Sequence, residues 1–512
     1  MKNRTLYFGD NLDILREKIP NESFDLIYLD PPFNSNRSYN VLFKEEAQES
    51  EAQIKAFEDS WHWTRESKEV FDYLVRKTNQ DISDLMLALE KIIGHNDVLA
   101  YLTMMTVRLI ELHRVLKKTG SLYLHCDPTA SHYLKIVLDV IFGKKNFMNE
   151  IIWHYRRWTT ASNRFQRMHD VIFYYTKTDN YIFTKPLQEY SNPEWVEDTV
   201  RGVVNGKLVR LKDEKGNYIK RQKESEGVLM HDVWEDINFI APTSKERLGY
   251  PTQKPEALLE RIIKASSNKG DWILDPFCGC GTTVSVSERL KRNWVGIDIT
   301  SLAINLIKYR IKNQFSLGNK QIYVDGLPTD LAGAKELFKK DPFQFEYWAL
   351  DLINAVPAQS KTKENMRGAD KGIDGIVVFH KDIKNGNGNG NGNGRWEYGK
   401  AIVQIKGGKV QRRDIAVLKG DVAREKAEAG IFITLEKPTK PMIQESIDAG
   451  SFKIPITNSV EFPKIQILTV EDLLQNKKLN LPQGLVKNYY KEAKPIEKND
   501  KKNWQTNIGV LF

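Results

Sequence analysis

Two short motifs, each directly after an apolar run, constrain the fold of this chain more than any other feature. One is Asp-Pro-Pro-Phe at residues 30–33, which follows the apolar run 24–29. The other is Asp-Pro-Phe-Cys-Gly-Cys-Gly at 275–281, which follows the run 272–274. Short apolar runs bounded by turn residues are typical of buried strands. Because open α/β sheets bind ligands at the carboxyl ends of their parallel strands, both motifs are predicted to lie at a ligand-binding edge.

Strand-like and helix-like segments alternate around these motifs. Short apolar runs at 5–8, 26–29, 121–124 and 171–175 are separated by longer amphipathic stretches. This alternation predicts the α/β class, with a mainly parallel sheet that helices cover.

The character of the chain changes at several points. We predict a first domain over 1–328, with a polar inserted region at about 158–249. A linker at 329–342, a second α/β domain at 343–474 and a basic, loosely ordered tail at 475–512 follow.

Charge and cysteine content restrict the partners and the compartment. Lys and Arg outnumber Asp and Glu by 76 to 67, which gives a net charge of +9 and favours polyanionic partners. The three cysteines, Cys126, Cys278 and Cys280, indicate neither a disulfide framework nor a zinc site. No apolar run is long enough to cross a bilayer and the first residues do not resemble a signal peptide, so we expect a cytoplasmic protein without a membrane partner.

The first motif has the groups needed to activate an amino group. The exocyclic nitrogen of adenine or cytosine is a poor nucleophile, because its lone pair is delocalised into the ring. The Asp30 carboxylate and the Pro31 carbonyl are predicted to accept its N–H bonds, while Pro31 and Pro32 fix the backbone. Phe33 offers a face on which an extruded base can stack. The alternative is an ordinary strand end followed by a Pro-Pro turn.

The second motif suits a nucleotide-like ligand that carries a carboxylate. Gly279 and Gly281 let the backbone approach a ligand, and Thr282 opens a predicted helix whose first N–H groups can face a carboxylate. Asp298 ends the next strand, where an acid can accept hydrogen bonds from both ribose hydroxyls. A dinucleotide site is the competing interpretation, but the G-x-G-x-x-G spacing is absent.

Over residues 5–327 the motifs and their order resemble the β-class amino-methylating DNA methyltransferases. These enzymes transfer a methyl group from S-adenosylmethionine to adenine N6 or cytosine N4. The resemblance implies a Rossmann-like methyltransferase fold, catalysis by residues 30–33, target recognition within 158–249 and double-stranded DNA as the substrate. It also implies that the following residues bind the cofactor: Asp10, Lys254, Pro255, Asp275, Phe277, Gly279, Gly281, Thr282 and Asp298.

The sequence leaves alternatives open for the target base and for the partners. Asp before the two prolines favours adenine N6; the alternative is a cytosine-N4 enzyme, or a modification subunit that works with a separate restriction subunit or as a homodimer. Arg156 and Arg157 lie in a cluster of cations and aromatics at 153–158 and are predicted to contact DNA. His125 and Asp127, at another strand end, are interpreted as structural, with a DNA contact as the alternative.

A second constellation lies in the C-terminal part. Asp374 precedes an apolar run, and Gln404 and Lys406 alternate on the next predicted strand, so the three can converge at one end. Such a set can hold Mg²⁺ and orient a water molecule that attacks a phosphate. Between the two strands, the Asn-Gly run 385–394 predicts a solvated hairpin loop.

Residues 343–457 resemble the Mrr-like branch of the PD-(D/E)xK restriction endonucleases. Gln404 replaces the second acid, and Glu346 matches an acid on the family's first helix. The resemblance implies a bacterial or phage restriction-modification protein with both methyltransferase and Mg²⁺-dependent nuclease activity. The alternative is a nuclease-like fold that only binds DNA or a partner, in a protein that senses DNA.

Overall fold

The structure is a computed structural model, and no described helix has both the length and the apolar character needed to span a membrane. The described residues are the following: 1–32, 37–45, 48–59, 62–156, 163, 165–188, 197–204, 207–222, 227–241, 243–244, 246–248, 250, 252–318, 321–358, 372–384, 395–454 and 460–482.

A nine-stranded sheet organises the N-terminal part, in the order β14-β6-β7-β5-β2-β15-β16-β1-β17. Each neighbouring pair in it is parallel except the two that involve β7. The α/β class and the mainly parallel sheet are therefore confirmed. The strands are β1 (Thr5–Phe8), β2 (Phe24–Leu29), β5 (Leu116–Cys126), β6 (Phe147–His154), β7 (His169–Thr176), β14 (Val233–Trp234), β15 (Trp272–Asp275), β16 (Asn293–Asp298) and β17 (Tyr323–Asp325).

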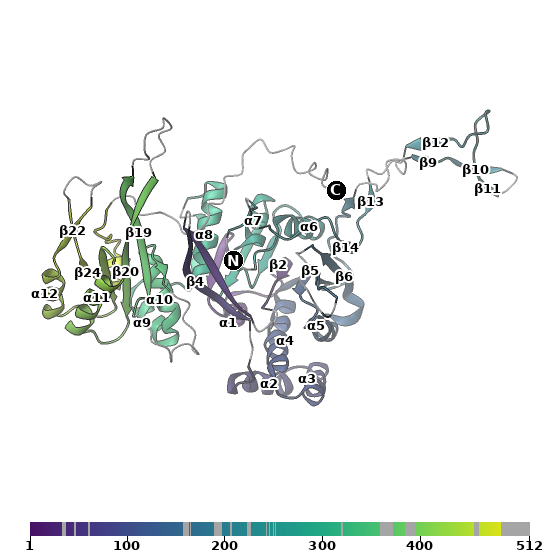
Figure 1. Cartoon of the computed structure of the whole chain (residues 1–512). Coiled ribbons are helices and arrows are strands. Elements are labelled where there is room, and N and C mark those ends of the chain that lie inside the picture. Colours follow the sequence, from purple (N-terminus) through teal and green to yellow (C-terminus); the bar gives the residue numbers. More distant parts are fainter. Residues whose placement is uncertain are drawn as a thin grey trace.

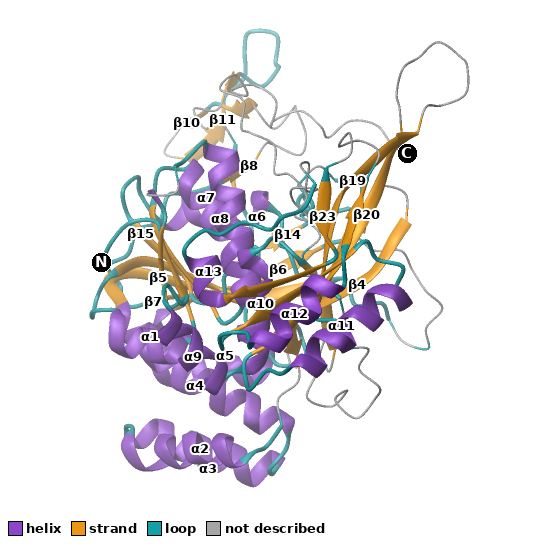
Figure 2. Ribbon diagram, turned by 90° about the vertical axis from the view of Figure 1, so that its left-hand side faces the viewer, coloured by secondary structure: helices purple, strands orange, loops and turns teal. Residues whose placement is uncertain are grey.

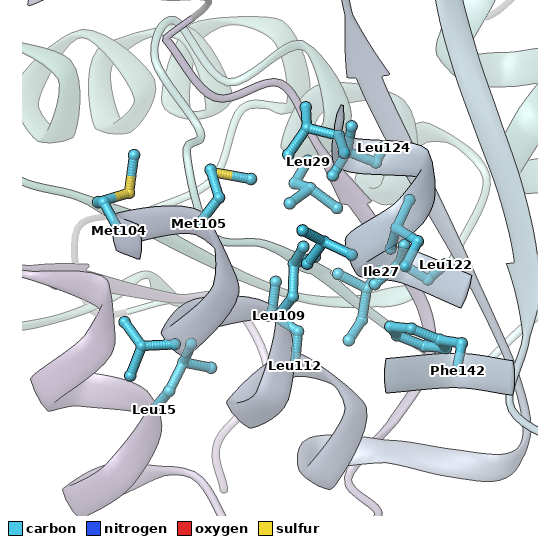
Figure 3. Packing of buried hydrophobic residues seen from close by; sticks show 14 of the residues in the cluster. Leu15, Ile27, Leu29, Met104, Met105, Leu109, Leu112, Leu122, Leu124 and Phe142 are labelled. Atoms are coloured by element: carbon cyan, nitrogen blue, oxygen red, sulfur yellow. The ribbon is translucent and has the colours of Figure 1, made fainter. Parts of the chain in front are cut away.

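Helices cover both faces of this sheet. The helices are α1 (Asn11–Lys18), α2 (Arg65–Lys77), α3 (Gln80–Ile93), α4 (Asp97–Val115), α5 (Ser131–Leu138), α6 (Glu256–Ser266), α7 (Thr282–Arg289) and α8 (Ser301–Phe315), with short turns of π-helix at 139–143 and 3₁₀-helix at 144–146. On one face, Leu109 and Leu112 of α4 pack against Ile27 and Leu122 (Figure 3). On the other face, α6 packs against the alternate residues of β2. Burial on both sides explains why β2 is apolar along almost its whole length.

Two further segments of the N-terminal part form strand pairs outside the large sheet. A hairpin of β3 (Arg37–Glu45) and β4 (Gln48–Asp59) follows the first motif. The predicted inserted region holds three small antiparallel pairs, and β9 to β12 extend away from the rest of the molecule (Figure 1). Its strands are β8 (Leu187–Gln188), β9 (Glu197–Thr199), β10 (Arg201–Val204), β11 (Lys207–Arg210), β12 (Lys220–Gln222) and β13 (Val228–Leu229).

The C-terminal part has its own five-stranded sheet, in the order β18-β19-β20-β21-β24. One hydrophobic core lies under α9, α10 and α13, and a second lies under α11 and α12. Figure 2 shows α11 and α12 side by side. The elements are α9 (Leu331–Lys340), α10 (Pro342–Leu352), β18 (Val356–Pro357), β19 (Gly375–Lys384), β20 (Arg395–Lys406), α11 (Arg412–Arg424), β21 (Ala429–Thr434), α12 (Lys440–Asp448), β22 (Ser451–Lys453), β23 (Glu461–Pro463), β24 (Ile465–Thr469) and α13 (Val470–Leu474).

The segment predicted as a linker carries helix α9. Ala334 of this helix is fully buried in the core of the second sheet, so the segment packs with that sheet. We therefore propose that the second domain starts at α9. The Asn-Gly run 385–394 lies outside the described residues, as does the tail from 483 onward.

Candidate functional site

Four acids come together at one edge of the large sheet because of its strand order. β2, β15, β16 and β1 are consecutive neighbours and parallel, so the residues at their carboxyl ends share an edge. Asp30 follows β2, Asp275 and Asp298 end β15 and β16, and Asp10 follows β1. Motifs more than 240 residues apart in the chain thus meet at the edge where α/β sheets bind ligands.

The two carboxylate oxygens of Asp30 differ in their hydrogen bonds within the described part of the chain. Lys254 Nζ donates to Asp30 Oδ2 at 2.5 Å, and both side chains are largely buried. Asp30 Oδ1 is also buried, and it has no hydrogen-bond partner among the described residues. An unpaired buried carboxylate oxygen is costly, so this oxygen is an acceptor ready for a ligand N–H. Lys254, predicted to bind the cofactor, contacts Asp30, and Pro255 is the N-cap of α6; cofactor binding by both residues stays a prediction.

Asp275 and Asp298 end neighbouring strands, and both accept hydrogen bonds from the backbone of the second motif. Asp275 Oδ1 accepts the backbone N–H of Phe277 at 3.1 Å, and burial raises the pKa of Asp275 to about 7. Asp298 Oδ2 accepts the N–H of Gly279 at 2.9 Å, which fixes the glycine loop to the end of the next strand. Burial also raises the pKa of Asp298, against the hydrogen bonds from Thr300 and Gly279.

The glycines of the loop are required by conformation and by space. Gly279 and Gly281 have φ of +47° and +73°, in the left-handed region that favours glycine. A Cβ on Gly281 would lie 2.6 Å from Ile307 Cγ1 of α8, so nothing larger fits. Gly281 is the N-cap of α7, and no side chain caps this helix, whose first residue is the buried Thr282. The free N–H groups of its first turn suit an anionic ligand group.

Asp10 is joined to the glycine loop through a network that the sequence did not reveal. It caps α1 by accepting the N–H of Leu12 at 2.7 Å, and Arg108 Nη2 donates to both of its carboxylate oxygens at 2.8 Å. Arg108 Nε donates to Asn11 Oδ1 at 2.6 Å, and Asn11 Nδ2 donates to Pro276 O at 2.8 Å. A signal was present, since Arg108 is the only charged residue of the apolar stretch 98–110.

A second buried arginine was also missed. Arg310 of α8 is 1% exposed, pairs with Glu256 Oε1 at 2.6 Å and donates to the carbonyl of Cys280 at 3.1 Å. Its hydrogen bond to Cys280 therefore fixes the glycine loop to α8.

His125 lies on β5, which pairs with β2, within the protein interior. It is fully buried, with its Nδ1 2.9 Å from the Tyr28 hydroxyl and its Nε2 3.1 Å from Asp170 Oδ2. Burial raises the pKa of Asp170, but the hydrogen bond and charge of His125 outweigh burial and bring it to about 2. This geometry favours the structural interpretation of His125. Asp127 accepts hydrogen bonds from Thr129 in a local turn.

The predicted DNA-contacting and base-stacking residues are only partly described. Arg156 is exposed at the end of the segment that follows β6. Arg157 and Phe33 lie outside the residues whose side chains the structure describes, so both assignments stay predictions.

Three of the four predicted nuclease residues, Asp374, Gln404 and Lys406, lie at one end of the second sheet. The Asp374 N–H donates to Val403 O at 2.8 Å, and Asp374 Oδ2 accepts the Ile405 N–H at 2.6 Å. Asp374 therefore flanks Gln404, whose buried Oε1 has no partner among the described residues, and Lys406 is exposed two positions further along β20. Glu346 lies on α10, which covers the face with Val403 and Ile405 rather than the alternate face, so its convergence with Gln404 stays a prediction.

Residues 24–309, more than half of the chain, match the family of N6/N4 DNA methylases. The chain belongs to this family. In addition, residues 337–464 match the restriction endonuclease family with the Mrr catalytic domain. Both resemblances drawn from the sequence are confirmed at the level of the family.

Individual relatives of this chain are distant in sequence. The chain is 32% identical over 206 residues to the type II methyltransferase M.HpaI of Haemophilus parainfluenzae, and the match covers 40% of this chain and 58% of that one. The DNA adenine methyltransferase YhdJ of Escherichia coli (strain K12) is 27% identical over 305 residues, 59% of this chain and 81% of its own. The chain spans just under three fifths of the length of several curated relatives that it matches. A solved DNA modification methylase from Thermus thermophilus, complexed with S-adenosyl-L-methionine, is 19% identical, with a TM-score of 0.34, and the match covers 63% of this chain and 97% of that one.

Proposed function

We propose that this chain transfers a methyl group from S-adenosylmethionine to adenine N6 in double-stranded DNA. One observation carries the proposal: the buried, unpartnered Oδ1 of Asp30 in the described part of the chain, at the sheet edge that Asp275, Asp298 and the glycine loop share. An extruded adenine can donate one N–H of its amino group to this oxygen. Lys254 holds the other oxygen at 2.5 Å and so fixes the direction in which Oδ1 points.

The residues at the edge fit the cofactor. The carboxylate of Asp298 can accept from ribose hydroxyls, and the positive φ of Gly279 and Gly281 opens the backbone beside the uncapped start of α7 for the methionine carboxylate. The bound cofactor supplies an electrophilic methyl group. Asp30 and the Pro31 carbonyl would hold the amino nitrogen, and its displaced proton would pass to an acceptor at the site or to water.

The choice of adenine rests on Asp30 and on the similarity to a DNA adenine methyltransferase. The alternative remains a cytosine-N4 enzyme, or a modification subunit that acts with a separate restriction subunit or as a homodimer. A cytoplasmic location suits any of these functions.

Replacing the acceptor tests the methyl-transfer proposal. Asp30→Ala removes the acceptor and leaves the glycine loop untouched, so we expect methylation to fall by a factor on the order of 100 to 1,000, while S-adenosylmethionine binding stays nearly the same. Asp30→Asn keeps one acceptor oxygen and should retain more activity than Asp30→Ala. Mass spectrometry of digested DNA measures the rate and separates N6-methyladenine from N4-methylcytosine. Normal methylation by Asp30→Ala would contradict the proposal.

We also propose that the second domain cleaves DNA with Mg²⁺. The buried oxygens of Asp374 and Gln404 supply the hard ligands that Mg²⁺ prefers, and the exposed Lys406 can contact the scissile phosphate. Bound Mg²⁺ would polarise that phosphate. In the competing function this domain binds DNA without cutting it; Lys406 could then still contact a phosphate, but no metal would be needed.

Removing the lysine tests the nuclease proposal. Lys406→Ala should abolish Mg²⁺-dependent cleavage of unmethylated DNA and leave methylation intact. Lys453→Ala is the control, because Lys453 pairs with Glu461 on the separate β22–β23 hairpin. Sequencing the products for modified bases and cut ends measures both activities. Equal cleavage by wild type and Lys406→Ala would refute the assignment.

A further inference from the structure

Helix α11 carries a buried carboxylate that neither proposed activity has used. Asp421 is 4% exposed, and its Oδ1 accepts from Arg424 Nη1 at 2.6 Å. Its Oδ2 is buried and has no hydrogen-bond partner among the described residues. Leaving a charged oxygen buried and unpaired is expensive, and such an atom indicates a group that binds there.

Asp421 and Gln404 converge on one glycine. A Cβ placed on Gly372 would lie 3.6 Å from Asp421 Oδ2 and 3.5 Å from Gln404 Nε2. Gly372 has a φ of +71°, and the missing side chain leaves room beside both groups. The side-chain oxygen of Gln404 is also buried and has no partner in the described part of the chain. Two buried side chains therefore approach the same glycine, and each has an acceptor oxygen for which the described residues supply no donor.

Asp374 belongs to the same place. It follows Gly372 by two residues, is 8% exposed, and flanks Gln404 through its hydrogen bonds to the backbone of Val403 and Ile405. No group of three His, Cys, Asp or Glu that could hold a metal occurs among the described residues. The cluster here differs from such a group, because it combines two carboxylates with one amide oxygen.

We propose that Asp421 is a further ligand of the divalent cation that Asp374 and Gln404 hold. This inference rests on the proposed nuclease function and extends its site to α11, which packs beside β20 (Figure 1). Gln404 is neutral, so Asp374 alone would give the site a single negative charge. Asp421 adds a second charge and offers a hard oxygen ligand.

Metal binding tests this inference without relying on cleavage. Mn²⁺ can be titrated into the full chain and followed by electron paramagnetic resonance, with wild type compared with Asp421→Asn and Asp374→Asn. We expect both variants to bind Mn²⁺ at this site at least about tenfold more weakly than wild type. Glu425→Gln is the matched control, since it removes a neighbouring carboxylate, one turn further on, that also contacts Arg424. Its Mn²⁺ affinity should equal that of wild type.

The Tm of Asp421→Asn in chelator tests whether Asp421 has only a structural role. Asp421→Asn removes the charge on an oxygen that has no partner among the described residues and keeps an acceptor oxygen for the half-exposed Arg424, so its Tm in chelator should stay close to that of wild type, while added Mn²⁺ should raise its Tm less. Weaker Mn²⁺ binding together with a lower Tm in chelator would overturn the inference. Wild-type affinity in Asp421→Asn but not in Asp374→Asn would overturn it and leave the nuclease site standing. No difference between wild type and Asp374→Asn would refute both.

Discussion

At the scale of single residues, carboxylates at the edge of the large sheet repel one another, and a ligand that donates hydrogen bonds to them can reduce this repulsion. Asp30, Asp275 and Asp298 lie close enough that the other two carboxylates raise the pKa of Asp275, in addition to the larger effect of burial. A fold that only needed stability would not gather three acids in its interior. Their presence fits a site that binds hydroxyl and amino groups of ligands.

Asp275 gives a prediction about pH. Its folded-state pKa of about 7 lies above its ordinary value of 3.8, so the folded protein holds this proton where the unfolded chain has lost it. Its contribution to stability is therefore present below about pH 4 and is lost as the pH rises to about 7, by a few kcal/mol at most. Asp275→Asn should flatten this part of the pH dependence of the free energy of unfolding, measured in urea at several pH values. Parallel profiles for wild type and variant would contradict the shifted pKa.

At the scale of elements, the glycine loop determines how α7 and α8 pack at the edge of the large sheet. Gly281 joins β15 to α7 in a left-handed conformation and contacts Ile307 of α8 without room for a side chain. Arg310, one turn further along α8, donates to the Cys280 carbonyl of the same loop. The loop is thus held by α8 from one side and by Asp298 from the other.

Two glycine substitutions separate backbone strain from steric clash. Gly281→Ala should lower the free energy of unfolding by about 2–4 kcal/mol, because strain and the clash with Ile307 add. Gly270→Ala should cost only about 1 kcal/mol, since Gly270 has a φ of +86° but nothing among the described residues within 4 Å of an added Cβ. Urea denaturation measures both. Ile307→Ala removes both γ carbons that lie near the added Cβ, so Gly281→Ala should cost less in that background than in wild type, whereas the cost of Gly270→Ala should not change.

At the scale of the whole molecule, the two domains meet through α8 and α10. Asn305 Nδ2 donates to Asp351 Oδ2 at 2.6 Å, and the Ser301 N–H donates to Gln344 Oε1 at 3.3 Å. α8 starts just after β16 ends at Asp298, so the helix that follows this strand is also the helix that contacts the second domain. The domains therefore share an interface as well as a chain.

A reciprocal pair of substitutions tests this interface. Asn305→Asp places two carboxylates opposite each other and should weaken the contact by about 1–3 kcal/mol. The combination with Asp351→Asn restores a donor and an acceptor and should recover most of the loss. Differential scanning calorimetry should show the unfolding transitions of the two domains separating in Asn305→Asp and returning in the double variant. Identical traces for all three proteins would mean that the contact does not couple the domains.

The sequence alone determined where the main strands lie along the chain and which family the motifs indicate. Apolar runs and their turn residues predicted the main strands, and the order of the motifs identified the methylase family, because strand periodicity and loop chemistry are local properties. Only the tertiary structure decided which groups share a site. These contacts depend on strand order and helix packing, which bring together residues far apart in the chain. They are the contacts of Lys254 with Asp30 and of Arg108 with Asp10, and the approach of Asp421 to Gln404. Spacing along the chain cannot report such contacts, because they exist only once the sheets have formed.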